Sequence, residues 1–152
     1  MLPYYFRNLA HANNYGGEVF ANWNVTSRWQ ISPGFSFLQM KVGLDPSSRD
    51  TSAQASVGYS PKQQAQLRST LDLPHGLEWD TPAYFVGALR YGPVPSYTRL
   101  DTRLGWRVGE SLEFSVAGQN LLTPRHIEFG DGLQVHVTQV ERSIVGKVTW
   151  RF

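Results

Sequence analysis

The chain of 152 residues contains no cysteine, and no apolar run approaches the roughly 18 to 20 residues that a membrane-spanning helix requires. The first absence excludes a disulfide framework and thiolate metal sites. Charged residues make up 17% of the chain, the net charge is +2, and the basic residues form no cluster, so we expect no nucleic-acid partner. The start of the chain lacks the pattern of a secretory signal, so the chain is either cytosolic or lacks its true N-terminus.

Signatures of catalysis are also absent. We find no Gly-x-Ser-x-Gly elbow, no His-Glu-x-x-His helix, no Gly-rich phosphate loop and no pair of acid/base carboxylates in an apolar setting. We therefore expect neither enzyme activity nor a bound cofactor.

What the sequence does contain is alternation, most clearly in residues 140–152. One parity holds Val140, Ile144, Val148, Trp150 and Phe152, and the other holds Glu141, Ser143, Lys147, Thr149 and Arg151. A period of two residues predicts an extended strand whose two faces meet different surroundings. A chain ending on such a strand suggests a transmembrane β-barrel, with apolar side chains toward lipid and polar side chains toward a lumen.

Turn residues divide the chain into about seven long strands, with a shorter extended piece near residues 2–6. The strands are predicted over residues 14–25, 29–41, 64–73, 77–91, 97–108, 112–121 and 140–152. Connections are tight at 26–28, 74–76 and 109–111 but long at 43–62 and 123–139, an asymmetry typical of outer-membrane barrels. Eleven tilted residues cover about 25 Å of membrane height, which matches the apolar band of such barrels.

Tryptophan and charge are sorted by parity. All five tryptophans fall on the apolar parity, near a tight turn or the C-terminus: Trp23, Trp29, Trp79, Trp106 and Trp150. Charges concentrate on the opposite parity, while Arg142 lies on the apolar parity beside a long loop, where it can reach headgroups. We predict that the tryptophans form a membrane girdle at the periplasmic edge. A soluble β-sandwich also places charges on one parity, so parity alone leaves that alternative open.

Five segments along the chain have distinctive sequences. They are Asn-Asn-Tyr-Gly-Gly-Glu at 13–18, Tyr-Thr-Arg-Leu-Asp-Thr-Arg-Leu-Gly-Trp-Arg at 97–107, Gly-Gln-Asn-Leu-Leu at 118–122, Arg-His-Ile-Glu-Phe at 125–129 and Val-Thr-Trp-Arg-Phe at 148–152. Together these segments resemble the C-terminal barrel of TonB-dependent outer-membrane receptors. The resemblance covers essentially the whole chain in the right order. Gly17, where that family usually has an apolar residue, and Phe20, at a lumen-parity position that is often polar, depart from the pattern.

The resemblance implies energised uptake of a scarce ligand, such as a ferric siderophore or cobalamin, across the bacterial outer membrane. Barrels of that family have about 22 strands and a plug in the lumen. Residues 1–152 would then form a single region, the C-terminal part of an all-β, antiparallel up-and-down barrel, without the plug and the N-terminal strands. The implied partners are outer-membrane lipid, the rest of the barrel and plug, the TonB energy-transducing complex through the missing N-terminal part, and the barrel assembly machinery. That machinery would read the terminal Phe152 as its signal, although one more girdle aromatic fits the same position.

Charges on the lumen parity are the candidate functional residues. We select Arg68, Arg90, Arg99, Asp101, Arg103, Arg107 and Glu113 as lumen-facing candidates for plug contacts or a polar path. They also fit hydrated wall charges without a ligand, because exposed ion pairs contribute only about 0 to 1 kcal/mol. Ligand recognition is expected in the long loops, with Arg49, Tyr59, Phe129 and Asp131 as candidates.

A metal site is conceivable where His126 and Glu128 would point to one side of an extended segment, near Asp131 and His136. The spacing matches no established signature, and we predict no metal.

Two other functions fit parts of the pattern. A complete small outer-membrane barrel of about eight strands would have a structural or adhesion role, but its narrow, filled interior suits many arginines poorly. A soluble β-sandwich binding module, for example for carbohydrate, would bury the tryptophans between two sheets.

Overall fold

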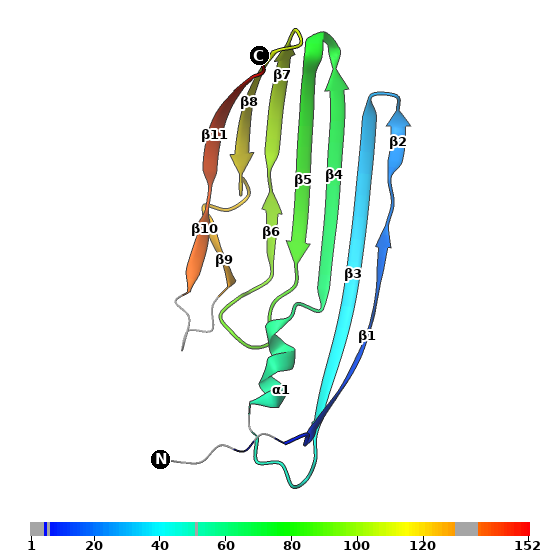
Figure 1. Ribbon diagram of the computed structural model, residues 1–152, viewed down its shortest axis with the longest axis vertical. Coiled ribbons are helices and arrows are strands. Elements are labelled where there is room, and N and C mark those ends of the chain that lie inside the picture. Colours follow the sequence, from blue (N-terminus) through cyan, green and yellow to red (C-terminus); the bar gives the residue numbers. More distant parts are fainter. Residues whose placement is uncertain (1–4, 6, 51, 130–136) are drawn as a thin grey trace.

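The computed structural model describes residues 5, 7–50, 52–129 and 137–152 (Figure 1). In chain order the strands are β1 (Ala10–Phe20), β2 (Trp23–Thr26), β3 (Trp29–Leu44), β4 (Gln63–Leu73), β5 (Leu77–Val86), β6 (Tyr97–Leu100), β7 (Thr102–Val108), β8 (Leu112–Gln119), β9 (Arg125–Phe129), β10 (Thr138–Glu141) and β11 (Ser143–Trp150). The helical elements are α1 (Ala53–Ser56) and two 3-10 turns, η1 (Val57–Tyr59) and η2 (Pro74–Gly76). Among the described residues, no helix is both long and apolar enough to cross a membrane.

The main sheet is an antiparallel up-and-down meander. Its strands follow the order β1-β3-β4-β5-β7-β8-β11, with β2 also paired to β3 and β6 to β5, while β9 and β10 form a separate hairpin. The tight turns and the C-terminus gather at one end, and the long connections and α1 lie at the other (Figure 1). The predicted all-β, up-and-down fold with two unlike ends is confirmed.

Strand boundaries differ from the predictions at several places. The strand predicted over 14–25 begins earlier and is interrupted between β1 and β2, and the strand predicted over 97–108 is interrupted at Asp101. The strand predicted to reach residue 91 ends at Val86, because the connection turns with Gly92 at φ 95° and a hydrogen bond from the Leu89 N–H to the Val94 carbonyl. The long loops contain β9 and α1, which the sequence analysis did not predict. The extended piece predicted near residues 2–6 falls almost wholly outside the described residues.

The sheet forms a single layer. In the described part of the chain, Val94 is the one buried hydrophobic residue, and it lies in a loop. The accessible surface is 11689 Å² for 17.2 kDa, whereas a compact soluble protein of that mass exposes about 7,800 Å². The excess is roughly 3,900 Å², as expected of a sheet whose two faces are both exposed in the described residues.

This geometry argues against both alternative architectures. A β-sandwich requires a second sheet against one face, but in the described residues the only other sheet is the β9–β10 hairpin. A complete small barrel requires its first and last strands to pair, whereas the described strands end in two separate edges at β1 and β11.

The strand register assigns side chains to two faces, because residues directly opposite in an antiparallel pair share a face. Trp29 lies opposite Leu71, which lies opposite Trp79, and Trp79 lies opposite Leu104. We call this side the apolar face. Its exposed large side chains include Val19, Trp23, Phe35, Leu67, Phe85, Val116 and Val148. The other side, which we call the charged face, holds Thr70 opposite Asp80 and Asp80 opposite Arg103.

The polarity of the two faces reverses near the loop end of β3. Beyond Phe37 the apolar face continues with Gln39 and Lys41, while the charged face continues with Met40 and Val42. Lys41 therefore breaks the predicted segregation of charge. The α1 and η1 segments contact β3, so this part of the strand packs against its own loop.

Candidate functional site

Two ion pairs brace the middle of the charged face. The first joins β4 to β5: the Arg68 guanidinium donates through Nε to Oδ1 of Asp80 at 2.8 Å and through Nη2 to Oδ2 at 2.7 Å. Thr70 donates its hydroxyl to the same carboxylate at 3.2 Å. The Asp80 side chain is 15% exposed and that of Arg68 is 58% exposed, so the pair is anchored in the wall and open to solvent on one side. A bidentate arginine–carboxylate pair fixes geometry as well as charge.

The second ion pair centres on Arg103 of β7. Its Nη2 donates to Oε1 of Glu113 on β8, and its Nη1 lies 3.6 Å from Oε2 of Glu78 on β5. Gly105 makes this placement possible, because a Cβ at that position would lie 2.9 Å from Nη2 of Arg103. One arginine thus bridges three strands.

A third group of contacts lies where β6 and β8 end, toward the long connections. Arg99 donates to Asp101 through Nε at 2.9 Å and through Nη2 at 2.8 Å. Asp101 accepts the backbone N–H of Asn120 at 2.9 Å. Asn120 has no exposed surface and a φ of 53°, a left-handed conformation that asparagine tolerates better than most residues.

The Asn120 side chain connects the sheet to the β9–β10 hairpin. Its Nδ2 donates to the Val140 carbonyl at 3.0 Å, and its Oδ1 accepts the Thr123 hydroxyl at 3.1 Å and faces Nδ1 of His126 at 3.1 Å. Nε2 of His126 lies 2.8 Å from Oε1 of Glu128. We call the group Tyr97, Arg99, Asp101, Asn120, Thr123, His126 and Glu128 the Asn120 cluster. The spacing of His126 and Glu128 predicted that both point to one side of an extended segment, but it did not indicate that they meet Asn120.

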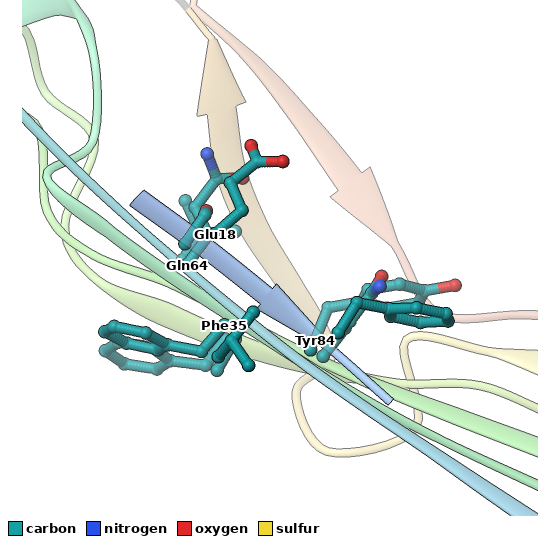
Figure 2. A pocket seen from close by; sticks show the side chains of 12 residues that line it. Glu18, Phe35, Gln64 and Tyr84 are labelled. Atoms are coloured by element: carbon teal, nitrogen blue, oxygen red, sulfur yellow. The ribbon is translucent and has the colours of Figure 1, made fainter. Parts of the chain in front are cut away.

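A shallow trough of about 220 Å³ crosses β1, β3, β4 and β5. The strand register places Glu18, Ser36 and Gln64 in one row across the strands and Phe20, Gln66 and Tyr84 in the next row, and both rows lie on the charged face. Figure 2 shows Glu18 and Gln64 directed to one side of the strands and Phe35 directed to the opposite side. Phe20, which departs from the family pattern, is 58% exposed in this trough.

The five tryptophans are exposed on the apolar face, at the end that carries the tight turns. Two of them place their indole N–H on the sheet itself: Trp29 donates to the Ser69 hydroxyl at 3.0 Å, and Trp79 donates to the Thr102 hydroxyl at 2.8 Å. The side chain of Trp150 is 71% exposed, and its ring lies 6.1 Å from that of Phe152. Their common position is what a girdle requires, and the girdle itself stays a prediction.

The comparison with protein families decides the identity of this sheet. The family model described as TonB dependent receptor-like, beta-barrel matches residues 2–121. The chain belongs to this family. A search of curated proteins found no significant match. The resemblance predicted from the sequence is therefore confirmed over residues 2–121, and members of this family are receptors and transporters of the bacterial outer membrane.

In this receptor barrel, the remaining charged candidates occupy less organised positions. Arg107 is exposed and lies opposite Glu113 in the strand register, but it makes no ion pair within 4.0 Å among the described residues. Arg90 is exposed in the connection after β5, so the strand position from which its orientation was predicted does not form. The lumen-facing roles of all seven candidates remain predictions.

The loop candidates of the receptor barrel are only partly described. The rings of Tyr59 and Tyr91 lie 6.4 Å apart, and Arg49 is exposed in the connection after β3. Asp131, His136 and the side chain of Phe129 fall outside the described residues. No group of three or more His, Cys, Asp or Glu side chains that could hold a metal ion occurs in the described ranges.

Proposed function

We propose that this chain is the C-terminal barrel region of an outer-membrane receptor that takes up a scarce ligand with energy from the TonB complex. A ferric siderophore or cobalamin is the ligand class that we favour. The observation that carries the proposal is the single open layer, with bulky apolar side chains exposed on one face and ion-paired side chains on the other. Lipid would cover the apolar face, and the further barrel strands and a plug would cover the two edges and the charged face.

The ion pairs of the charged face suit a wall that surrounds a plug. Arg68 and Asp80 neutralise each other within the wall, whereas the single cation Arg103 faces the two carboxylates of Glu78 and Glu113 and leaves that group with one negative charge. Their side chains stay partly exposed and keep hydrogen-bonding capacity for water or for plug groups. This arrangement supports a hydrated lining rather than one tight ionic contact with a ligand.

The test of uptake is genetic. We expect deletion of the gene in its bacterial host to abolish accumulation of one radiolabelled ligand from a panel of ferric siderophores and cobalamin. Inactivation of the energy-transducing complex should give the same loss, and the intact gene should restore uptake. Unchanged accumulation of every ligand in the deletion strain would contradict the proposal.

A second experiment tests the proposed interaction of Phe152 with the barrel assembly machinery. Deletion of Phe152 should reduce the heat-modifiable, membrane-inserted receptor in the cell envelope, and Phe152→Tyr should preserve it, because the substitution keeps a terminal aromatic ring. Trp150→Phe is the matched control, since it changes an adjacent girdle aromatic and leaves the terminal residue intact. Equal insertion of the deletion variant and the wild type would show that Phe152 is no signal.

A further inference from the structure

The β9–β10 hairpin is joined to the main sheet through a buried histidine. His126 is 9% exposed, and its ring stacks on that of Tyr97 with centroids 4.3 Å apart and planes at 28°. One ring nitrogen faces Asn120 and the other faces Glu128. The hairpin lies toward the same end as the long connections (Figure 1).

The hydrogen-bond partners determine one of the two imidazole protons. The Val140 carbonyl can only accept a hydrogen bond, so the Asn120 amide must direct its NH2 group toward it and its oxygen toward His126. An amide oxygen cannot donate. Nδ1 of His126 therefore carries a hydrogen.

The contact on the other side of the ring requires a second proton. Nε2 of His126 lies 2.8 Å from a carboxylate oxygen of Glu128, and two acceptors at that distance repel each other unless a proton lies between them. Nη1 of Arg99 lies 3.8 Å from the same carboxylate oxygen, so the carboxylate faces a cation on that side as well. The closed arrangement thus holds one proton more than a neutral histidine beside an ionised glutamate.

We propose that His126 and Glu128 form a proton-dependent latch, which holds the β9–β10 hairpin against the sheet while the shared proton is bound and releases it when that proton leaves. Among the described residues, the charged and titratable groups around His126 are Glu128 on β9, Arg99 and Tyr97 on β6, and Asp101 after β6. Glu141 on β10 lies opposite Arg125 in the hairpin register. With the proton bound, the two cations Arg99 and His126 balance the two anions Asp101 and Glu128. Without it, the same four groups carry a net negative charge at a site that is only partly exposed.

The direction of the pH dependence follows from the proton count. The closed latch binds more protons than the open one, so raising the pH favours opening. Histidine changes charge between about pH 5 and pH 8. A rise in the pH outside the cell across this range would therefore open the hairpin. The latch is a property of the hairpin and the sheet, and it does not depend on which ligand the receptor transports.

Hydrogen–deuterium exchange of the receptor in lipid nanodiscs tests the latch. Exchange of residues 120–129 and 137–142, corrected for intrinsic rates, should increase between pH 5.5 and pH 8 by up to about tenfold per pH unit, the limit for release of one proton. Residues 63–73 in the middle of the sheet serve as the internal reference and should not change. Equal protection of the hairpin at both pH values would overturn the proposal, whether or not ligand uptake is found.

Two variants separate the proton from ordinary packing. In Glu128→Gln the amide NH2 can donate to the lone pair of Nε2, so the network closes without an extra proton and the hairpin should stay protected at both pH values. His11→Gln changes an exposed histidine on β1 and should keep the wild-type pH dependence. A Glu128→Gln hairpin that still opens with rising pH, or that is unprotected at both pH values, would refute the latch, because the shared proton would then not be what holds it.

Discussion

Replacing Asn120 with alanine tests whether one side chain organises the end of the sheet. Asn120 is fully buried and has a positive φ. Alanine removes the donor to the Val140 carbonyl and the acceptor for Thr123 and for Nδ1 of His126. The substitution therefore leaves polar groups of the loop and the hairpin without partners.

The expected cost can be worked from these contacts. The Thr123 hydroxyl can turn to water, which leaves the partly buried Val140 carbonyl and the buried His126 N–H without a partner. Each costs about 1 to 3 kcal/mol. Alanine in the left-handed region adds about 1 kcal/mol. We expect the free energy of unfolding to fall by about 3 to 5 kcal/mol, allowing for partial relaxation of the site.

Two companion substitutions distinguish the side chain from the backbone. Asn120→Gly loses the same hydrogen bonds but accepts the positive φ, so it should be about 1 kcal/mol more stable than Asn120→Ala. Gln119→Ala, at the exposed neighbouring position, should change stability by less than about 0.5 kcal/mol. The measurement is urea unfolding of the receptor in lipid bilayers, followed by tryptophan fluorescence. If Asn120→Ala is as stable as Gln119→Ala, the cluster does not organise this end of the sheet.

Three smaller predictions address a turn, the apolar face and a loop. Gly109→Ala should lower the urea midpoint by the equivalent of about 1 kcal/mol, because Gly109 has a φ of 62°. The new Cβ would meet no atom within 4 Å, so the cost comes from the backbone alone, and an unchanged midpoint would mean that the turn adapts. Trp79→Phe should cost about 0.5 to 1.5 kcal/mol through loss of the indole bond to Thr102, and equal stability of the two proteins would show that this bond does not form in lipid. Hydrogen bonds from the Ser52 backbone N–H and hydroxyl hold the pKa of Asp50 below its usual 3.8. The ionised carboxylate therefore orders the loop at any pH above 3.8, and this ordering is lost as the pH falls through the lower pKa of the folded state. NMR of the Ser52 amide should therefore show no change between pH 8 and pH 5 and a transition only in stronger acid, whereas Asp50→Asn should show no transition.

The sequence predicted the sheet well because alternation is a local signal. Parity placed all five tryptophans on one face, and the strand register has them there. Strand ends were predicted less accurately. Between Val86 and Tyr97, alternation continues for several residues, but the turn at Gly92 and the hydrogen bond from Leu89 to Val94 take the chain out of the sheet.

The Asn120 cluster was missed for a different reason. Its contacts join residues that are far apart in the chain, such as Asn120 with Asp101 and with Val140. No periodicity reports such contacts. The local signals were an asparagine, which tolerates a positive φ, and the pair His126 and Glu128 two residues apart, and neither signal specifies a partner.

The reversal of polarity on β3 fits the height of the apolar band of outer-membrane barrels. On the apolar face, residues 29–37 cover about 30 Å of strand and about 21 Å of height after a 45° tilt, which fits within the roughly 25 Å band of outer-membrane barrels. All 16 residues of β3 would rise to about 37 Å by the same arithmetic, which exceeds the band. Lys41 would then lie on the apolar face without entering hydrocarbon. Alternation persists along the whole strand, but which parity is apolar depends on what surrounds the strand at each height.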